Sequence, residues 1–340
     1  MKTVLVTGGS GFLGGWCVVE LLRRGYQVRT TVRDLAREEE VRSAVSAEVD
    51  PGDRLTVLAA DLLADAGWEQ AVAGCDHVLH VASPFPPAQP KDPDELIVPA
   101  RDGTLRVLRA SLAAGVERIV VTSSVAAITG GGKPVSGALT EENWSDPDNL
   151  KMTPYARSKT IAEQAAWELA RERGATEKLA TVNPGAIIGP VLGDSGDRSF
   201  SLQAIERLLS GIPGAPRIGF SFVDVRDVAD LEIRAMTSPD AGGERFIATE
   251  AFMWMPEVAA VLRDRLGEDA AKVPTRTIPN LLVRAMAVFD PSVRSIIGQL
   301  GRKTLISSEK ARTELGWSPR PLDETITECA QSLLAKPDQA

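Results

Sequence analysis

The sequence is poor in the residues that bind metals and form disulfides. Its 340 residues include three cysteines and two histidines. Cys17, Cys75 and Cys329 form no Cys-x-x-Cys pair, and His77 and His80 both lie in one apolar run. A dedicated metal site needs three or four ligands at characteristic spacings. We therefore expect no metal site and assign neither histidine a catalytic role. Isolated cysteines fit a reducing compartment, which we take to be the cytoplasm.

Long apolar runs and an excess of positive charge are also absent. No stretch approaches the roughly 20 apolar residues that span a bilayer. The first apolar run begins within three residues of Met1 and leads directly into a glycine-rich loop, unlike a signal peptide. The net charge of −8 disfavours nucleic acid and anionic membranes as main partners. We expect a cytoplasmic protein that binds small molecules; its oligomeric state is open, a homodimer being one option.

Short apolar runs alternate with stretches of helical period through the first half of the chain. The runs predict strands at residues 3–7, 27–32, 55–59, 77–81, 118–122 and 180–183. The periodic stretches predict helices at residues 11–24, 68–72, 96–114 and 153–172. This alternation is typical of an α/β fold of the Rossmann type, a doubly wound parallel sheet covered by helices.

The pattern weakens after Pro184. Residues 189–219 are broken by prolines and predict mostly loops. Further strands are expected at 222–225 and 245–248, and helices at 257–266 and 324–334. We predict two interleaved parts, a dinucleotide-binding domain and a smaller, mostly C-terminal substrate-binding lobe. The first comprises residues 1–190, with 220–250 returning to it, and the second comprises 191–219 and 251–340.

A glycine-rich loop joins the first predicted strand to the first predicted helix. Gly8, Gly11 and Gly14 are spaced three apart. At such a turn, glycines permit a tight bend, close approach of the backbone to a pyrophosphate, and close packing of helix on strand. The amide groups of the helix N-terminus then face the anion. We predict that the three glycines bind a dinucleotide together with Phe12 and Leu13; an ordinary strand-to-helix turn is the alternative.

The residues after the second strand bear on the choice between NAD and NADP. An acidic residue there would accept the ribose hydroxyl of NAD. This chain has Arg33 followed by Asp34. A guanidinium group pairs with a 2′-phosphate through a planar fork, which favours NADP(H). Two alternatives stay open: Asp34 neutralises Arg33, or Arg33 is an ordinary surface arginine.

The ends of the later strands supply further candidates for cofactor contacts. Ligands of open α/β sheets gather at the carboxyl ends of the strands. On this ground we predict that six residues at these ends line the cofactor: Asp61, Leu62, Val81, Ala82, Ser83 and Thr122.

One tyrosine carries the expected chemistry. Tyr155 and Lys159 are four residues apart and lie one turn from each other on a predicted helix. Ser124 follows the fifth predicted strand, and Ser123 competes with it because neighbours on an extended segment point opposite ways. A lysine ammonium group would lower the phenol pKa from about 10 towards neutrality. We predict Tyr155 as general acid, Lys159 as its tuning group and a ribose ligand, and Ser124 as the residue that holds a carbonyl oxygen.

The combined motifs resemble the extended short-chain dehydrogenases/reductases, and within them the dihydroflavonol 4-reductase and cinnamoyl-CoA reductase-like group with its microbial aldehyde and ketone reductases. The resemblance rests on the glycine loop, on the Ser124, Tyr155 and Lys159 set, and on segments across nearly the whole chain. These are residues 28–34, 80–84, 91–95, 142–146, 183–190, 222–229, 308–311 and 315–317.

This resemblance implies a ketone or aldehyde reductase that uses NADPH. It further implies that Arg33 binds the phosphate and that Pro184 and the Ile187 backbone contact the nicotinamide. The chain departs from the group at Thr129, where plant dihydroflavonol reductases have asparagine, so a flavonoid substrate is not expected. It also has Ala100 where asparagine often precedes the Gly-Thr of the fourth helix, which argues against a proton relay there.

Two other functions use the same motifs. A nucleotide-sugar epimerase or dehydratase with tightly held NAD⁺ also uses Ser, Tyr and Lys, and would need cations for a diphosphate. Arg198, Arg207 and Arg217 are available but scattered. A non-enzymatic NADP sensor is disfavoured because the chain keeps both the tyrosine and the lysine. An NADPH-dependent reductase of a small or medium, largely apolar carbonyl compound is the leading hypothesis.

Overall fold

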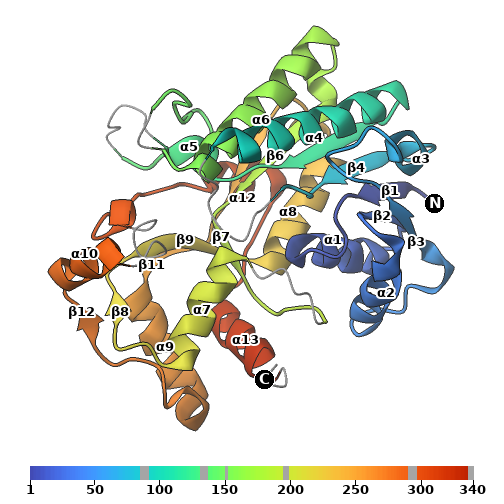
Figure 1. Ribbon diagram of the computed structural model, residues 1–340. Coiled ribbons are helices and arrows are strands. Elements are labelled where there is room, and N and C mark those ends of the chain that lie inside the picture. The colour runs from blue at the N-terminus through green and yellow to red at the C-terminus, as the bar shows by residue number, and fades with distance from the viewer. Residues whose placement is uncertain (85–91, 131–136, 150–151, 194–198, 290–296, 336–340) are drawn as a thin grey trace.

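A seven-stranded parallel sheet forms the centre of the computed structural model, which describes residues 1–84, 92–130, 137–149, 152–193, 199–289 and 297–335 (Figure 1). The strand order is β10-β6-β5-β4-β1-β2-β3. The bounds are β1 Thr3–Val6, β2 Gln27–Val32, β3 Leu55–Ala59, β4 His77–His80, β5 Arg118–Thr122, β6 Leu179–Pro184 and β10 Arg245–Ala248. The Rossmann-type sheet predicted from the sequence is confirmed, with every strand of the first half within about two residues of its expected bounds.

Helices cover both faces of this sheet because parallel strands need crossover connections. One face carries α3 Trp68–Val72, α4 Asp94–Ala113, α5 Ala126–Thr129 and α6 Pro154–Glu172. The other carries α1 Phe12–Arg23, α2 Glu38–Ser46 and α8 Val225–Thr237. Each face buries its own apolar cluster; Val107, Ile119 and Leu169 belong to the α4–α6 side, and Val18, Val120 and Val228 to the α1–α8 side.

A smaller lobe lies beside the carboxyl ends of the strands (Figure 1). It contains a three-stranded sheet in the order β11-β9-β7 and a two-stranded pair. The strands are β7 Ala186–Ile188, β8 Ala215–Pro216, β9 Gly219–Asp224, β11 Ala251–Trp254 and β12 Thr277–Ile278. The helices of this part are α7 Phe200–Ser210, α9 Met255–Leu266, α10 Asn280–Phe289 and α13 Leu322–Leu334. Helix α12 Glu309–Leu315 packs against α8 and β10.

The expectation that residues 189–219 are mostly loop needs correction. Helix α7 occupies eleven of them, begins at the Ser199 cap, whose hydroxyl accepts from the Leu202 amide at 3.4 Å, and ends at Gly211 with a φ of 95°. Its apolar face packs into the main core through Leu202, Ile205 and Leu208. The strand β9 joins the lobe sheet, whereas α8 and β10 return to the central sheet. The division into two domains stays a prediction.

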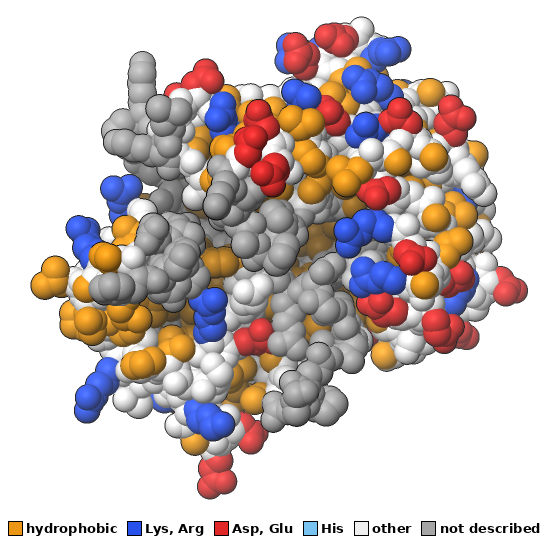
Figure 2. Space-filling model, viewed as in Figure 1, with side chains coloured by type: hydrophobic (Ala, Val, Ile, Leu, Met, Phe, Trp, Pro, Cys, Tyr) orange, Lys and Arg blue, Asp and Glu red, His pale blue; other side chains and the backbone are white. Residues whose placement is uncertain are grey.

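The surface facing the viewer in Figure 2 carries charges of both signs, with hydrophobic side chains gathered over α10. Leu281, Leu282 and Val288 of that helix are exposed. In the described part of the chain no helix combines the length and the hydrophobicity that a bilayer span requires. The three cysteines are free and buried.

Candidate active site

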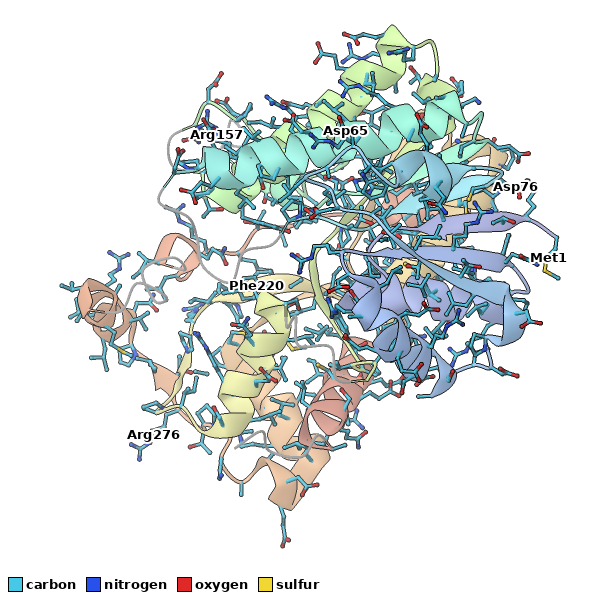
Figure 3. All side chains as sticks on the ribbon, turned by 45° about the vertical axis from the view of Figure 1, so that its right-hand side comes forward. Met1, Asp65, Asp76, Arg157, Phe220 and Arg276 are labelled. Atoms are coloured by element: carbon cyan, nitrogen blue, oxygen red, sulfur yellow. The ribbon has the colours of Figure 1, made fainter. Side chains whose placement is uncertain are left out.

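The candidate site lies where the strand ends face the lobe. Figure 3 shows Met1 and Asp76, just before β1 and β4, on the side of the sheet away from the lobe, so the carboxyl ends point towards it. Strand β1 lies between β4 and β2, and the order of the strands reverses there. Open α/β sheets bind their ligands at such a reversal.

The glycine loop has no room for side chains. Gly8 has a φ of 76°, and the Gly11 amide donates to the Gly8 carbonyl at 2.9 Å. A Cβ on Gly14 would lie 2.2 Å from that carbonyl oxygen. The loop is also anchored to β2, because the Gly8 amide donates to the Thr31 hydroxyl at 3.1 Å. A backbone cradle of this kind, followed at once by the N-terminus of α1, fits a pyrophosphate.

Phe12 and Leu13, which we predicted to contact the cofactor, differ in the group that a ligand could reach. Phe12 lines a hollow between the loop and α2, together with Val41 and Leu192. The Leu13 side chain is buried in the main core. Its backbone amide, in the first turn of α1, is therefore the group of Leu13 available to a ligand.

The contacts of Asp34 bear on the alternative that it neutralises Arg33. Its carboxylate accepts the Ala36 amide at 2.9 Å and caps a short 3₁₀ helix. Arg33 is exposed and, among the described residues, has no ion pair. Asp34 therefore does not neutralise Arg33, and the guanidinium group is available to an anion. Four residues on, Arg37 pairs with Glu40 at 2.8 Å.

The other predicted cofactor residues surround the same strand ends. One Asp61 oxygen accepts the Leu63 amide at 2.9 Å, and Leu62 packs against Gly103, where a Cβ would lie 2.9 Å from the Leu62 Cβ. The Ala82 amide donates to the Thr7 hydroxyl at 3.0 Å, which holds the strand end close to Gly8.

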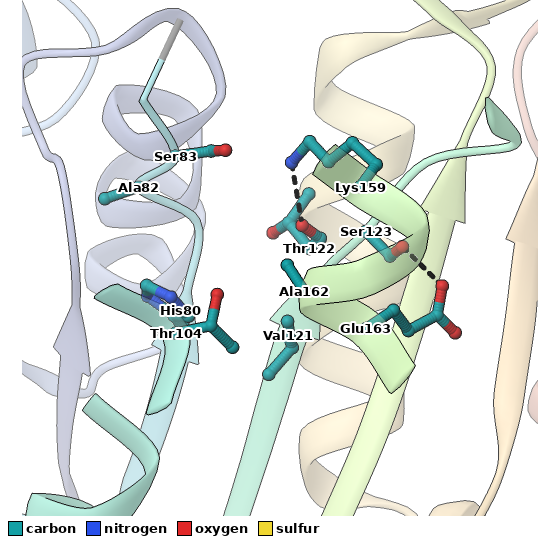
Figure 4. Close-up of a pocket in the computed structure, with 10 residues that line it drawn as sticks. All are labelled: His80, Ala82, Ser83, Thr104, Val121, Thr122, Ser123, Lys159, Ala162 and Glu163. Carbon is teal, nitrogen blue, oxygen red and sulfur yellow. Dashed lines mark hydrogen bonds between the residues drawn. The ribbon is translucent and has the colours of Figure 1, made fainter. Parts of the chain in front are cut away.

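A pocket opens between the end of β4 and α6 (Figure 4). It is lined on one side by His80, Ala82, Ser83 and Thr104, and on the other by Val121, Thr122, Ser123, Lys159, Ala162 and Glu163. Val81 instead packs against the main core. His80 is buried and contacts the Thr7 hydroxyl at 2.9 Å. Burial, with a further contribution from Lys159, lowers its pKa to about 3, so it stays neutral.

Ser124 and Tyr155 meet across this site. Tyr155 lies in the first turn of α6, where the Thr153 hydroxyl caps the helix by accepting the Ala156 amide at 3.2 Å. The side chains of Tyr155 and Ser124 are hydrogen-bonded. Ser123 instead donates to the Glu163 carboxylate at 2.5 Å. The alternation expected for neighbouring serines thus leaves Ser124 facing the tyrosine.

The pKa of Tyr155 departs from the expectation, and that of Lys159 is also shifted. Burial raises the pKa of the Tyr155 phenol, and the bond with Ser124 opposes it. We predicted a lowered value, but in the protein alone desolvation of the phenolate outweighs nearby charge. Lys159 donates to the Thr122 carbonyl at 3.3 Å. Desolvation lowers its pKa to about 8, against the opposing effect of Glu163 and Glu232.

Two residues named from family resemblance lie on the lobe side of the pocket. The Pro184 carbonyl, at the end of β6, accepts the Val125 amide at 2.9 Å. Ile187 pairs with Val223 in the lobe sheet, and its carbonyl accepts the Ser201 hydroxyl at 2.5 Å. The roles of these residues towards a cofactor stay predictions.

The two residues at which the chain departs from the resembled group lie in helices. Thr129 ends α5, and Ala100 is buried in α4.

The sequence did not reveal the buried network beneath the site. Glu163 is 1% exposed and accepts from Arg245 Nε at 2.7 Å and from Asn183 Nδ2 at 2.8 Å. Asn183 also donates to the Ser124 carbonyl at 3.2 Å. A usable signal was the spacing of Glu163, four residues after Lys159 on the same helix face.

Comparison with known proteins places these motifs in context. Residues 4–248 match the model of the NAD dependent epimerase/dehydratase family. Cinnamoyl-CoA reductase CAD2 of Medicago truncatula is 34% identical over 341 residues, which cover 98% of this chain and 96% of that protein. Dihydroflavonol 4-reductase of Zea mays is 37% identical over 281 residues, 78% of this chain and 75% of that protein.

The solved structures include similar folds. The crystal structure of yeast methylglyoxal/isovaleraldehyde reductase Gre2 complexed with NADPH has a TM-score of 0.81 and 26% sequence identity, covering 98% of each chain. Gre2 in complex with NADPH from Candida albicans gives the same TM-score and identity over 98% of this chain and 99% of that chain.

Replacing Gly14 with alanine tests the cradle. The added Cβ would meet backbone, so the loop must shift, at a cost of about 1–3 kcal/mol. We expect weaker dinucleotide binding, measured by fluorescence titration. Gly15→Ala is the matched control, because its Cβ would meet the flexible Leu192 side chain at 3.2 Å and the Gly9 carbonyl oxygen only at an ordinary contact distance of 3.5 Å. Equal affinity in both variants would contradict the role of the loop.

Replacing Glu163 with alanine tests the buried network. The Arg245 charge would be left without its partner, and the free energy of unfolding should fall by about 3–5 kcal/mol. Urea denaturation measures this. Glu168→Ala, which removes an exposed carboxylate from the same helix, should change stability by less than about 0.5 kcal/mol. A small effect at Glu163 would show that the ion pair is dispensable.

Proposed function

The chain belongs to the NAD-dependent epimerase/dehydratase family, within the extended short-chain dehydrogenases/reductases, and from that membership we propose an NADPH-dependent oxidoreductase that reduces a ketone or aldehyde to an alcohol. The resemblance seen in the sequence is confirmed by the family match and by the plant reductases. The expected cofactor agrees with the NADPH complexes of its structural neighbours.

One observation carries the proposal. The Tyr155 phenol is hydrogen-bonded to Ser124, one helical turn from the Lys159 ammonium group, at the strand ends that adjoin the glycine loop. A hydroxyl to hold a carbonyl oxygen, an acid to protonate it and a cation beside the acid are the groups that carbonyl reduction requires.

The residues of this chain have distinct tasks in the reaction. When bound between the glycine loop and Lys159, NADPH would supply the hydride. Ser124 holds the substrate carbonyl oxygen by a hydrogen bond, and Tyr155 donates its phenolic proton to that oxygen. Burial keeps the phenol neutral, which is the form that acts as an acid. Lys159 stabilises the phenolate left behind.

The lobe sheet supports a largely apolar substrate. Phe252 lies opposite Ser221, and Trp254 opposite Gly219, in the antiparallel pair of β9 and β11. These side chains share one face of the sheet, whereas Phe222 and Met253 on the other face pack into the core. The half-buried rings of Phe252 and Trp254 meet edge to face at 4.9 Å. We propose that they form part of the wall for a small or medium aryl ketone or aldehyde.

The alternative of a nucleotide-sugar epimerase or dehydratase shares the family name. Its substrate diphosphate would need converging cations, but Arg207 is exposed on α7 and Arg217 stacks on Trp254 at 5.1 Å. Arg198 lies outside the described residues. Release of NAD⁺ on denaturing the purified protein would support the epimerase; a preference for added NADPH supports the reductase.

The setting of the activity is also proposed. Buried free cysteines favour a reducing compartment, and we propose the cytoplasm. A homodimer is compatible with this function, and light scattering on the purified protein decides it.

Replacing Tyr155 with phenylalanine should abolish carbonyl reduction. The variant keeps the ring but lacks the proton donor, and general acid catalysis is worth about 10²–10⁴-fold in rate. NADPH oxidation with a panel of aryl ketones and aldehydes measures this, and NADPH affinity should stay within about threefold, well under 1 kcal/mol. Absence of turnover in the wild-type protein over the panel would refute the proposal.

Replacing Arg33 with serine should shift cofactor preference towards NADH. A charge-assisted bond to the 2′-phosphate is worth about 1.5–3 kcal/mol, so KM for NADPH should rise by about tenfold or more while KM for NADH changes little. Arg24→Ser is a control on the same side of the sheet, because Arg24 pairs with Asp230. Unchanged preference would assign the phosphate to another cation.

A further inference from the structure

A second buried acid lies under the active site, on the opposite face of the sheet from α6. Glu232 of α8 is fully buried. One of its carboxylate oxygens accepts a hydrogen bond from the Thr122 hydroxyl, and the other accepts from the Cys17 thiol at 3.4 Å. Its neighbours on α8 are Leu231 and Ile233, both core residues. Burying an ionised carboxylate costs stability unless hydrogen bonds or an opposite charge compensate for the lost water.

Thr122 connects this acid to the catalytic lysine. Its hydroxyl donates to Glu232, and its backbone carbonyl accepts from Lys159 Nζ at 3.3 Å. Thr122 therefore lies between the Glu232 carboxylate and the Lys159 ammonium group. Each of these two groups acts electrostatically on the other. Figure 4 shows the Thr122–Lys159 contact at the mouth of the pocket.

We propose that Glu232 is a positioning residue for the reductase reaction, which through Thr122 fixes the end of β5 and keeps Lys159 in its ammonium form beside Tyr155. The inference rests on the proposed function, since it concerns the lysine that serves the phenol. It assigns a positioning role to an acid whose hydrogen bonds, within the described residues, are with Thr122 and Cys17.

The polar and titratable groups that act on Glu232 come from three elements. Helix α1 contributes the Cys17 thiol, whose pKa burial raises well above its usual value, with Glu20 acting on it. Strand β5 contributes only the neutral Thr122, and α6 contributes Lys159. Burial raises the pKa of Glu232 to about 7, against the opposing effect of Thr122, Cys17 and Lys159. Around neutral pH the acid is thus partly ionised, and its charge favours the ammonium form of Lys159.

The consequence is a specific change in pH dependence. Lys159, with a pKa of about 8, is charged below that pH and loses its charge as the pH rises. Glu232→Gln keeps the shape and one acceptor oxygen for the Thr122 hydroxyl but removes the negative charge. The Lys159 pKa should then fall by about one unit, the effect of a unit charge roughly 10 Å away at an effective dielectric of about 20.

The experiment titrates Lys159 directly. In protein labelled with ¹³C-lysine, the Lys159 Cε resonance is assigned by its loss in Lys159→Met, and its titration midpoint is read without cofactor. We expect the midpoint to be about one pH unit lower in Glu232→Gln. The alkaline limb of kcat/KM for carbonyl reduction should move by the same amount, with activity below pH 7 changed less.

A second variant guards against a folding defect. Thr122→Val removes the hydrogen bond that lowers the Glu232 pKa, so Glu232 is less ionised and the Lys159 midpoint should fall in the same direction. Glu168→Gln, on the exposed face of α6, should leave it unchanged. A folded Glu232→Gln or Thr122→Val with the wild-type midpoint would overturn the inference. Failure of the reductase proposal would show as absent turnover in the wild type, whatever the resonance does.

Discussion

The buried carboxylate of Glu163 is the constraint on which the active site depends. It accepts hydrogen bonds from Arg245 of β10, from Asn183 of β6 and from Ser123 directly after β5, while its own helix carries the tyrosine and the lysine. A buried charge is tolerated only when its hydrogen bonds are complete. The carboxylate therefore holds three strands and α6 in one arrangement. Because Ser123 is fixed to Glu163, Ser124 is left to face Tyr155.

Burial shifts the pKa values of Tyr155 and Lys159, the two groups that we propose for proton transfer, in opposite directions. It raises the pKa of the Tyr155 phenol and lowers that of Lys159 to about 8. Both shifts favour neutral forms, as desolvation requires. A neutral phenol suits reduction, which needs a proton donor, but a neutral lysine would not stabilise the phenolate. The acids Glu163 and Glu232, acting on Lys159 from different elements, resolve this conflict by favouring its charged form.

The sequence predicted those parts of the molecule that depend on local pattern. The strands, the glycine loop and the helix with Tyr155 follow from period, spacing and backbone sterics, and they agree with the structure. Helix α7 was missed because prolines and glycines flank it, although its apolar face is buried by tertiary contacts. Glu163 and Glu232 were missed for a related reason. Acidic residues on helices are usually exposed to solvent. Glu163 and Glu232 are buried because strands distant in the sequence pack over them. The choice of Ser124 over Ser123 likewise needed the position of Glu163.

Helix α8 connects the smaller lobe to this arrangement of charges. At its N-terminus, the Asp224 cap accepts Arg226 at 2.7 Å and Arg320 at 2.9 Å, so the C-terminal segment is tied to the end of β9. Two turns further on, the same helix carries Glu232 beneath Thr122. The ion pairs that hold the C-terminal segment and the acid that acts on Lys159 are therefore carried by one helix, which packs against both β9 and β5. The position of Glu232 beneath Thr122 thus depends on the same helix that anchors the C-terminal part of the chain.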